Sequence, residues 1–120
     1  MTQLSGMTDI YLHRDAVDFR KSINGLMVIV EDEIKQSPFN HALFVFCNRK
    51  RDKIKALYWD DTGFCLWYKR LEKETFKWPR PSNTDLSPLA LTEKEWDWLL
   101  SGLDLTKIQT HQPLSYTDFR

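Results

Sequence analysis

The residues best suited to chemistry are basic and aromatic side chains that intermingle between Leu43 and Pro79. Nine of the chain's 16 aromatic residues fall in this segment, and Lys and Arg residues are interleaved with them. Basic side chains neutralise phosphates, and aromatic rings exposed on a sheet can stack on nucleobases. Most aromatic residues on the sheets of small domains belong to the core. The basic residues are therefore the stronger candidates for a binding role. The segment therefore predicts a surface that binds a polyanion or another protein.

Charge is distributed unevenly along this chain, although its formal net charge is zero. Residues 49–80 contain ten Lys or Arg and five Asp or Glu, a local charge of +5, whereas residues 1–48 and 81–120 carry −2 and −3. Segregated charge creates a local potential that the net value conceals. The basic segment is therefore either a binding surface or a sheet edge that lysines keep solvated. The candidate binding residues are Arg49, Lys50, Arg51, Lys53, Lys55, Lys69, Arg70, Lys73 and Lys77.

The sequence lacks the constellations that are typical of enzymes. Asp60 and Asp61 are adjacent, so a strand would place them on opposite faces, and the sequence DDTG is first of all a turn. His13, His41 and His111 stand alone, without the spacing of a metal-ligand pair. A glycine-rich phosphate loop and a GxSxG nucleophile elbow are also missing. We therefore predict no enzymatic activity, no catalytic, cofactor-binding or metal-binding residues, and no small-molecule substrate.

The length and the cysteine pattern favour a small cytoplasmic protein. At 120 residues the chain is predicted to form a single domain over residues 1–120, with a core from about 10 to 103 between flexible N-terminal residues and a C-terminal tail. Cys47 and Cys65 form no CxxC motif, and both lie in apolar runs where a free thiol behaves as a small hydrophobe. No apolar run approaches the roughly 18 residues of a membrane helix. The N-terminus lacks the basic and apolar regions of a secretory signal.

Two helices are predicted on either side of a central group of strands. A short strand at Ile10–His13 precedes a helix over Asp18–Lys35, for which Asp18 is the expected N-cap. Apolar residues recur on this helix at helical spacing, at Ile23, Leu26, Met27, Val30 and Ile34. The second helix is predicted within residues 86–105, where Thr92 and Glu95 have the spacing of a capping box.

Between these helices the sequence predicts an antiparallel meander. Its strands are Leu43–Asn48, Lys53–Asp60 and Phe64–Arg70, joined by the turns RKRD and DDTG, and Thr75–Trp78 is a possible fourth strand. This register places Cys47 beside Ile54 and Cys65 beside Tyr58, so we expect both thiols to be free. One face then carries Phe44, Phe46, Lys55, Leu57, Trp59, Phe64, Leu66, Tyr68 and Arg70, and the other carries Leu43, Val45, Cys47, Ile54, Ala56, Tyr58, Cys65, Trp67 and Lys69.

Both faces of the meander are rich in apolar side chains, so both need at least partial cover. Either each helix covers one face, or both helices lie on one face and a partner covers the other. The predicted fold class is α+β, with a mainly antiparallel sheet of three to five strands.

The block from Leu43 to Pro79, preceded by DFRKSINGL at 18–26 and by Pro38-Phe39, closely resembles a known family. It is similar to the TnpB accessory protein of the bacterial insertion-sequence family sixty-six, also called Orf2-like, from about Ile10 to Leu103. The chain departs from the family pattern at His41 and Glu74, where glycine is usual.

The resemblance implies an accessory role in transposition, beside a separate transposase that performs strand transfer. The expected partners are that transposase, DNA at the element ends, or both, with no membrane. The alternative is a pure protein-interaction module that scaffolds the transposition complex without DNA contact. The resemblance supplies no catalytic residues.

Overall fold

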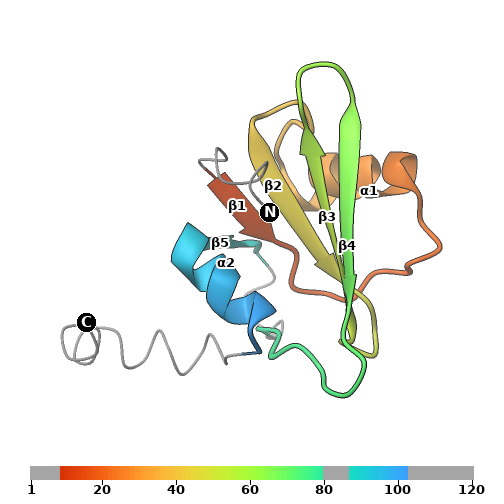
Figure 1. Cartoon of the computed structure of the whole chain (residues 1–120). Coiled ribbons are helices and arrows are strands. Elements are labelled where there is room, and N and C mark those ends of the chain that lie inside the picture. The colour runs from red at the N-terminus through yellow and green to blue at the C-terminus, as the bar shows by residue number, and fades with distance from the viewer. Residues whose placement is uncertain (1–8, 80–86, 103–120) are drawn as a thin grey trace.

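A computed structural model describes residues 9–79 and 87–102 and has an α+β architecture (Figure 1). Its five-stranded sheet has the order β4-β3-β2-β1-β5. The strands are β1 Asp9–Leu12, β2 Ala42–Cys47, β3 Lys53–Trp59, β4 Phe64–Arg70 and β5 Leu89–Leu91. The helices are α1 Ile23–Ile29, which continues directly into the π-helix η2 Val30–Ile34, and α2 Glu93–Leu100.

The predicted antiparallel meander is confirmed over β2, β3 and β4. Leu57 of β3 lies opposite Phe44 on one side and Leu66 on the other, as the period-2 pattern requires. The sheet as a whole is mixed, however, because β1 pairs parallel with β2 and antiparallel with β5. The parallel pair arises because α1 and η2 carry the chain back to the starting end of β1, and parallel neighbours need such a crossover.

The first helix is shorter than the sequence predicts and is capped elsewhere. Ser22 is the N-cap, and Asp18 does not cap the helix. The Asp18 carboxylate instead accepts hydrogen bonds from the backbone N–H and the guanidinium of Arg20. At the other end Lys35 adopts a left-handed conformation (φ 63°), and the N–H of Gln36 donates to the carbonyl of Val30 at 3.2 Å.

Two predictions at the C-terminal side of the meander are wrong. Residues 75–78 form no strand, yet Phe76 and Trp78 are buried there in irregular chain. The Trp78 indole N–H donates to the carbonyl of His13 at 3.1 Å, which ties this segment to the chain after β1. Leu89–Leu91, predicted within the second helix, forms the edge strand β5 instead. The helix begins only after Thr92, where the expected capping box with Glu95 is present.

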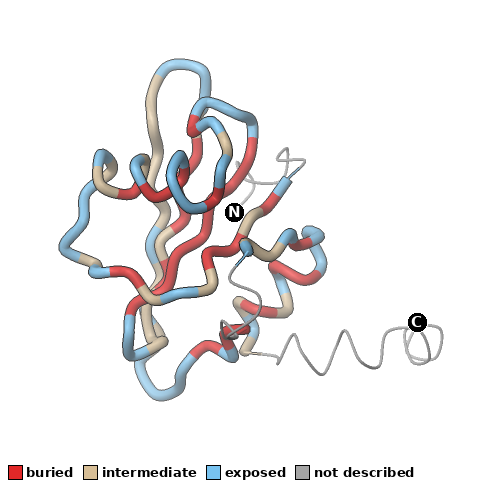
Figure 2. Tube along the Cα trace, turned by 180° about the vertical axis from the view of Figure 1, so that it is seen from behind, coloured by how far each residue is buried: buried red, intermediate tan, exposed pale blue. Residues whose placement is uncertain are grey.

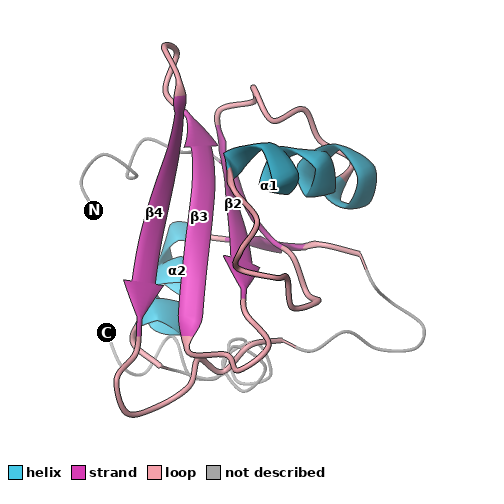
Figure 3. Ribbon diagram, turned by 90° about the vertical axis from the view of Figure 1, so that its right-hand side faces the viewer, coloured by secondary structure: helices cyan, strands magenta, loops and turns pink. Residues whose placement is uncertain are grey.

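The two helices cover opposite faces of the sheet, which decides between the two arrangements that the sequence left open (Figure 3). On one face Leu26, Ile29, Val30 and Ile34 pack on Ala42, Phe44, Phe46 and Leu57. On the other face Trp96, Leu99, Phe76 and Trp78 pack on Leu43, Val45, Ile54 and Tyr58. Burial is greatest along the central strands and lowest in the turns (Figure 2).

Both cysteines are free, as predicted, and they belong to the core on the α2 side. Cys47 lies opposite Ile54, and Cys65 lies opposite Tyr58. Burial raises the pKa of the Cys47 thiol to about 11, so this cysteine is an inert packing group.

The turn between β2 and β3 is built around the buried amide of Asn48. Its Oδ1 accepts hydrogen bonds from the backbone N–H groups of Asp52 (3.1 Å) and Lys53 (3.0 Å), and its Nδ2 donates to the Asp52 carboxylate (2.7 Å). The bond from Asn48 is the main reason that the pKa of Asp52 is lowered. One side chain thus fixes the loop from which the basic residues project.

Truncating a core residue of α1 should destabilise the protein strongly. Leu26 is fully buried against the sheet, so Leu26→Ala should lower the free energy of unfolding by about 2–5 kcal/mol. Val28 lies on the same helix with 53% of its surface exposed, and Val28→Ala should change this free energy by less than about 0.5–1 kcal/mol. Urea titrations of both variants test this, and equal losses would show that α1 does not pack as described.

Removing the Asn48 amide should loosen the β2–β3 turn. Asn48→Ala leaves two backbone N–H groups and the Asp52 carboxylate without their partner, which should cost about 1–3 kcal/mol. The control is Asn40→Ala, since among the described residues the exposed Asn40 side chain makes one weak hydrogen bond, which it donates to Gln36 at 3.2 Å. Urea titration gives the stability, and amide hydrogen exchange of Lys53 gives the local effect. Unchanged exchange at Lys53 would contradict the assigned role of Asn48.

Candidate nucleic-acid or partner interface

The basic residues predicted at the hairpin tip do not all face solvent. Arg49 and Lys50 are exposed at the β2–β3 turn. Arg51 is half-buried in a left-handed conformation (φ 64°), and its Nη1 is buried without a hydrogen-bond partner among the described residues. Its backbone bridges two segments, because its N–H donates to the Asn48 carbonyl and its carbonyl accepts from Phe76. Arg51 therefore contributes to the architecture of the turn.

Lys53 and Lys55 follow the turn on β3 and share the face of the sheet that α1 covers. Lys53 is half-buried and lies 3.6 Å from the Asp52 carboxylate, a weak and partly solvated ion pair. The Lys55 ammonium donates to the Phe19 carbonyl at 2.8 Å and lies 4.9 Å from the centre of the Phe19 ring. Lys55 thus clamps the loop before α1 onto the sheet.

The remaining predicted residues are scattered around the same end of the molecule. Lys69 points to the opposite face, where its ammonium donates to the carbonyl of Leu100 at the end of α2. Arg70 pairs with Glu72 at 2.9 Å. Lys73 and Lys77 are exposed in the irregular segment after β4.

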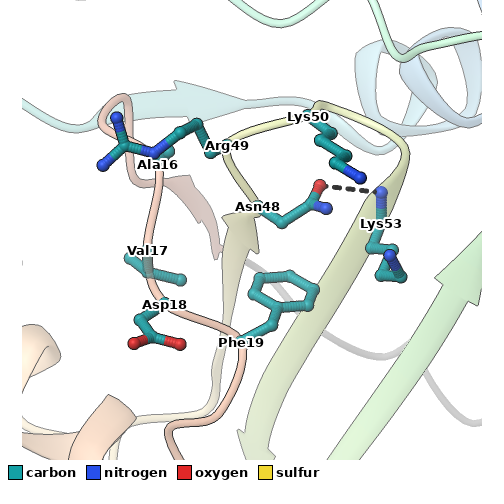
Figure 4. Close-up of a pocket in the computed structure, with 8 residues that line it drawn as sticks. All are labelled: Ala16, Val17, Asp18, Phe19, Asn48, Arg49, Lys50 and Lys53. Atoms are coloured by element: carbon teal, nitrogen blue, oxygen red, sulfur yellow. Dashed lines mark hydrogen bonds between the residues drawn. The ribbon is translucent and has the colours of Figure 1, made fainter.

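A groove separates the 16–20 loop from the β2–β3 turn and brings part of the predicted set together (Figure 4). It consists of two adjoining hollows of about 390 and 970 Å³, within the size range of ligand sites. The charged residues in its lining are five basic and one acidic. They are Arg20, Arg49, Lys50, Lys53, Lys55 and Asp18.

The close-up shows how the groove is arranged. The ring of Phe19 extends between the loop and β3, below Asn48 and Lys53, while Arg49 reaches toward Ala16 (Figure 4). The sheet contributes Tyr68 to the wider hollow. The groove therefore combines cations from the β2–β3 turn, from β3 and from the 16–20 loop with two aromatic side chains in its walls.

The prediction from charge missed the two aromatic residues of the groove, Phe19 and Tyr68, and one of its cations, Arg20. Arg20 lies outside the basic segment, so counting charged residues along the sequence does not group Arg20 with Lys50. The guanidinium of Arg20 holds the pKa of Asp18 well below its usual range. For Phe19 and Arg20 the signal in the sequence is the block DFRK at 18–21, which belongs to the family resemblance, and Tyr68 lies in the aromatic and basic segment between Leu43 and Pro79.

The opposite end of the meander has a different chemistry. Phe39, 52% exposed, packs on Trp59 and Phe64 with ring centroids 5.1 and 5.3 Å away. Beside them His41 pairs with Asp61 of the β3–β4 turn at 3.0 Å. An aromatic and acidic end thus faces away from the basic end.

Within residues 9–79 and 87–102, no three His, Cys, Asp or Glu residues are placed to hold a metal ion. In the same ranges, no helix has the length and hydropathy to cross a membrane.

Comparisons with known proteins agree with the resemblance seen in the sequence. Residues 8–110 match the family described as IS66 Orf2 like protein. Two proteins of Sinorhizobium fredii, both described as uncharacterized, are similar. The protein y4jC is 32% identical over 93 residues, which cover 78% of this chain and 77% of y4jC. The protein y4hO is 30% identical over 95 residues, which cover 79% and 80%.

No solved structure matches the chain significantly. The family match spans most of its length and includes every helix and strand described above. The chain belongs to the IS66 Orf2-like family of insertion-sequence proteins.

Proposed function

We propose that this protein is a non-catalytic accessory subunit of transposition that binds DNA at the ends of its insertion sequence. Membership of the IS66 Orf2-like family is the basis for a role in transposition. The groove at the basic end of the sheet supplies the binding surface, because its lining contains five cations and one carboxylate.

The observation that carries the proposal is the rigid presentation of these cations. Asn48 fixes the turn from inside, so Arg49 and Lys50 project from a defined backbone. Lys55 fixes the facing loop through the Phe19 carbonyl. Phosphate contacts from such pre-organised cations release counterions, and their contribution to affinity falls as salt rises.

A second candidate function is a protein-interaction module that docks the transposase. It is favoured by the aromatic cluster of Phe39, Trp59 and Phe64, because an exposed ring in contact with other rings is a common element of protein interfaces. The two functions use opposite ends of the meander and are compatible with one another.

Neutralising the exposed part of the turn should separate these functions. The variant Arg49→Ala/Lys50→Ala removes two exposed charges and should change the free energy of unfolding by less than about 0.5 kcal/mol per site. Transposition of a reporter element should fall sharply. The slope of log affinity for element-end DNA against log salt should flatten by about two units, roughly one for each lost phosphate contact.

The matched control is Lys94→Ala, which removes an exposed lysine from α2 on the other face of the sheet. It should leave transposition and the salt slope unchanged. If the double variant folds and transposes normally, the basic turn serves only solubility. A binding defect of equal size at every salt concentration would favour a protein partner over DNA.

A further inference from the structure

The part of the sheet beside the groove carries an unusual set of side chains. On the face that α1 packs against, Lys53 lies opposite Arg70, and Lys55 lies opposite Tyr68. The helix covers the other half of this face, around Leu57 and Leu66. Three cations therefore surround one tyrosine on a part of the sheet that the helix leaves open.

Tyr68 is exposed to 51%, although it lies on a strand next to the core. Phe19 flanks it, with a distance of 6.5 Å between the ring centroids and an angle of 55° between the ring planes. Phe19 is itself held, because Lys55 donates to its carbonyl and lies over its ring. Tyr68 is therefore a positioned aromatic surface, supported from one side and accessible from the other.

Cations on both sides of the groove can contact phosphates while a base lies on this ring. Lys50 is exposed on the turn, and the Lys53 ammonium makes a long ion pair of 3.6 Å with Asp52. On the opposite wall Arg20 projects into solvent from its pair with Asp18, with 91% of its side chain exposed. Aromatic platforms combined with a basic groove are the usual elements of single-strand recognition.

We propose that the groove binds an unpaired strand of DNA, with a base stacked on Tyr68 and the flanking phosphates on Lys50 and Lys53. A duplex cannot use this platform, because its bases are stacked on one another. The inference rests on the proposed DNA-binding function and specifies the form of DNA that the protein recognises.

The test compares a fluorescein-labelled DNA strand of about 12 nucleotides with the duplex of the same sequence, by fluorescence anisotropy of the full chain. The single strand should bind more tightly. Tyr68→Ala should weaken single-strand binding by roughly 5- to 150-fold, the usual range for loss of one stacked base. Tyr68→Phe keeps the ring and should stay within about threefold of the original affinity.

Two controls keep this result interpretable. Val28→Ala removes a comparably exposed apolar side chain on α1 and should not change binding. A bromodeoxyuridine strand, irradiated on the unmodified protein, should crosslink to Tyr68, which mass spectrometry identifies without relying on any variant.

The outcomes distinguish the inference from the function on which it rests. Duplex binding that equals or exceeds single-strand binding, with Tyr68→Ala unchanged and Arg49→Ala/Lys50→Ala impaired, overturns the single-strand site but retains DNA binding. Salt-insensitive or undetectable binding of both probes overturns both. Crosslinking at aromatic residues other than Phe19 and Tyr68 also overturns the proposed site.

Discussion

The burial of β2 on both faces is the constraint on which the rest of this structure depends. All six residues of the strand, Ala42–Cys47, are inaccessible to solvent or nearly so. A strand with apolar side chains on both faces is stable only when each face is covered. The chain meets this requirement with α1 and η2 on one side, and with α2 and the segment around Phe76 and Trp78 on the other.

The same constraint leaves only the ends of β2 for exposed groups, because both of its faces are covered. Beyond Cys47, the chain turns through Asn48 and exposes Arg49 and Lys50. Before Ala42, the chain carries the exposed ring of Phe39. The basic and the aromatic ends are thus held apart by the length of the meander, and the two proposed functions use different ends.

Local patterns predicted the meander, its register and the capping box at Thr92, because each depends on neighbours in sequence or on a period of two. The parallel pairing of β1 and the strand β5 depend on contacts across the sheet, which no local pattern encodes. The basic segment could be predicted from charge. The inward course of Arg51 and the recruitment of Arg20 and Tyr68 to one groove could not, because they follow from the backbone of the turn and the placement of the 16–20 loop.

The position of β5 and α2 at the end of the described chain has a consequence for folding during synthesis. The meander and α1 have all the residues of their side of the core available once Arg70 has left the ribosome, and their contacts span short sequence distances. The other face, with Leu43, Val45 and Ile54, is partly covered by Phe76 and Trp78, and its cover is complete only after Trp96 and Leu99 leave the ribosome. At elongation rates of about 5–20 residues per second, the part of this apolar surface that α2 covers stays exposed for a few seconds in each nascent chain. During those seconds the nascent chain presents an incompletely covered apolar face to its surroundings.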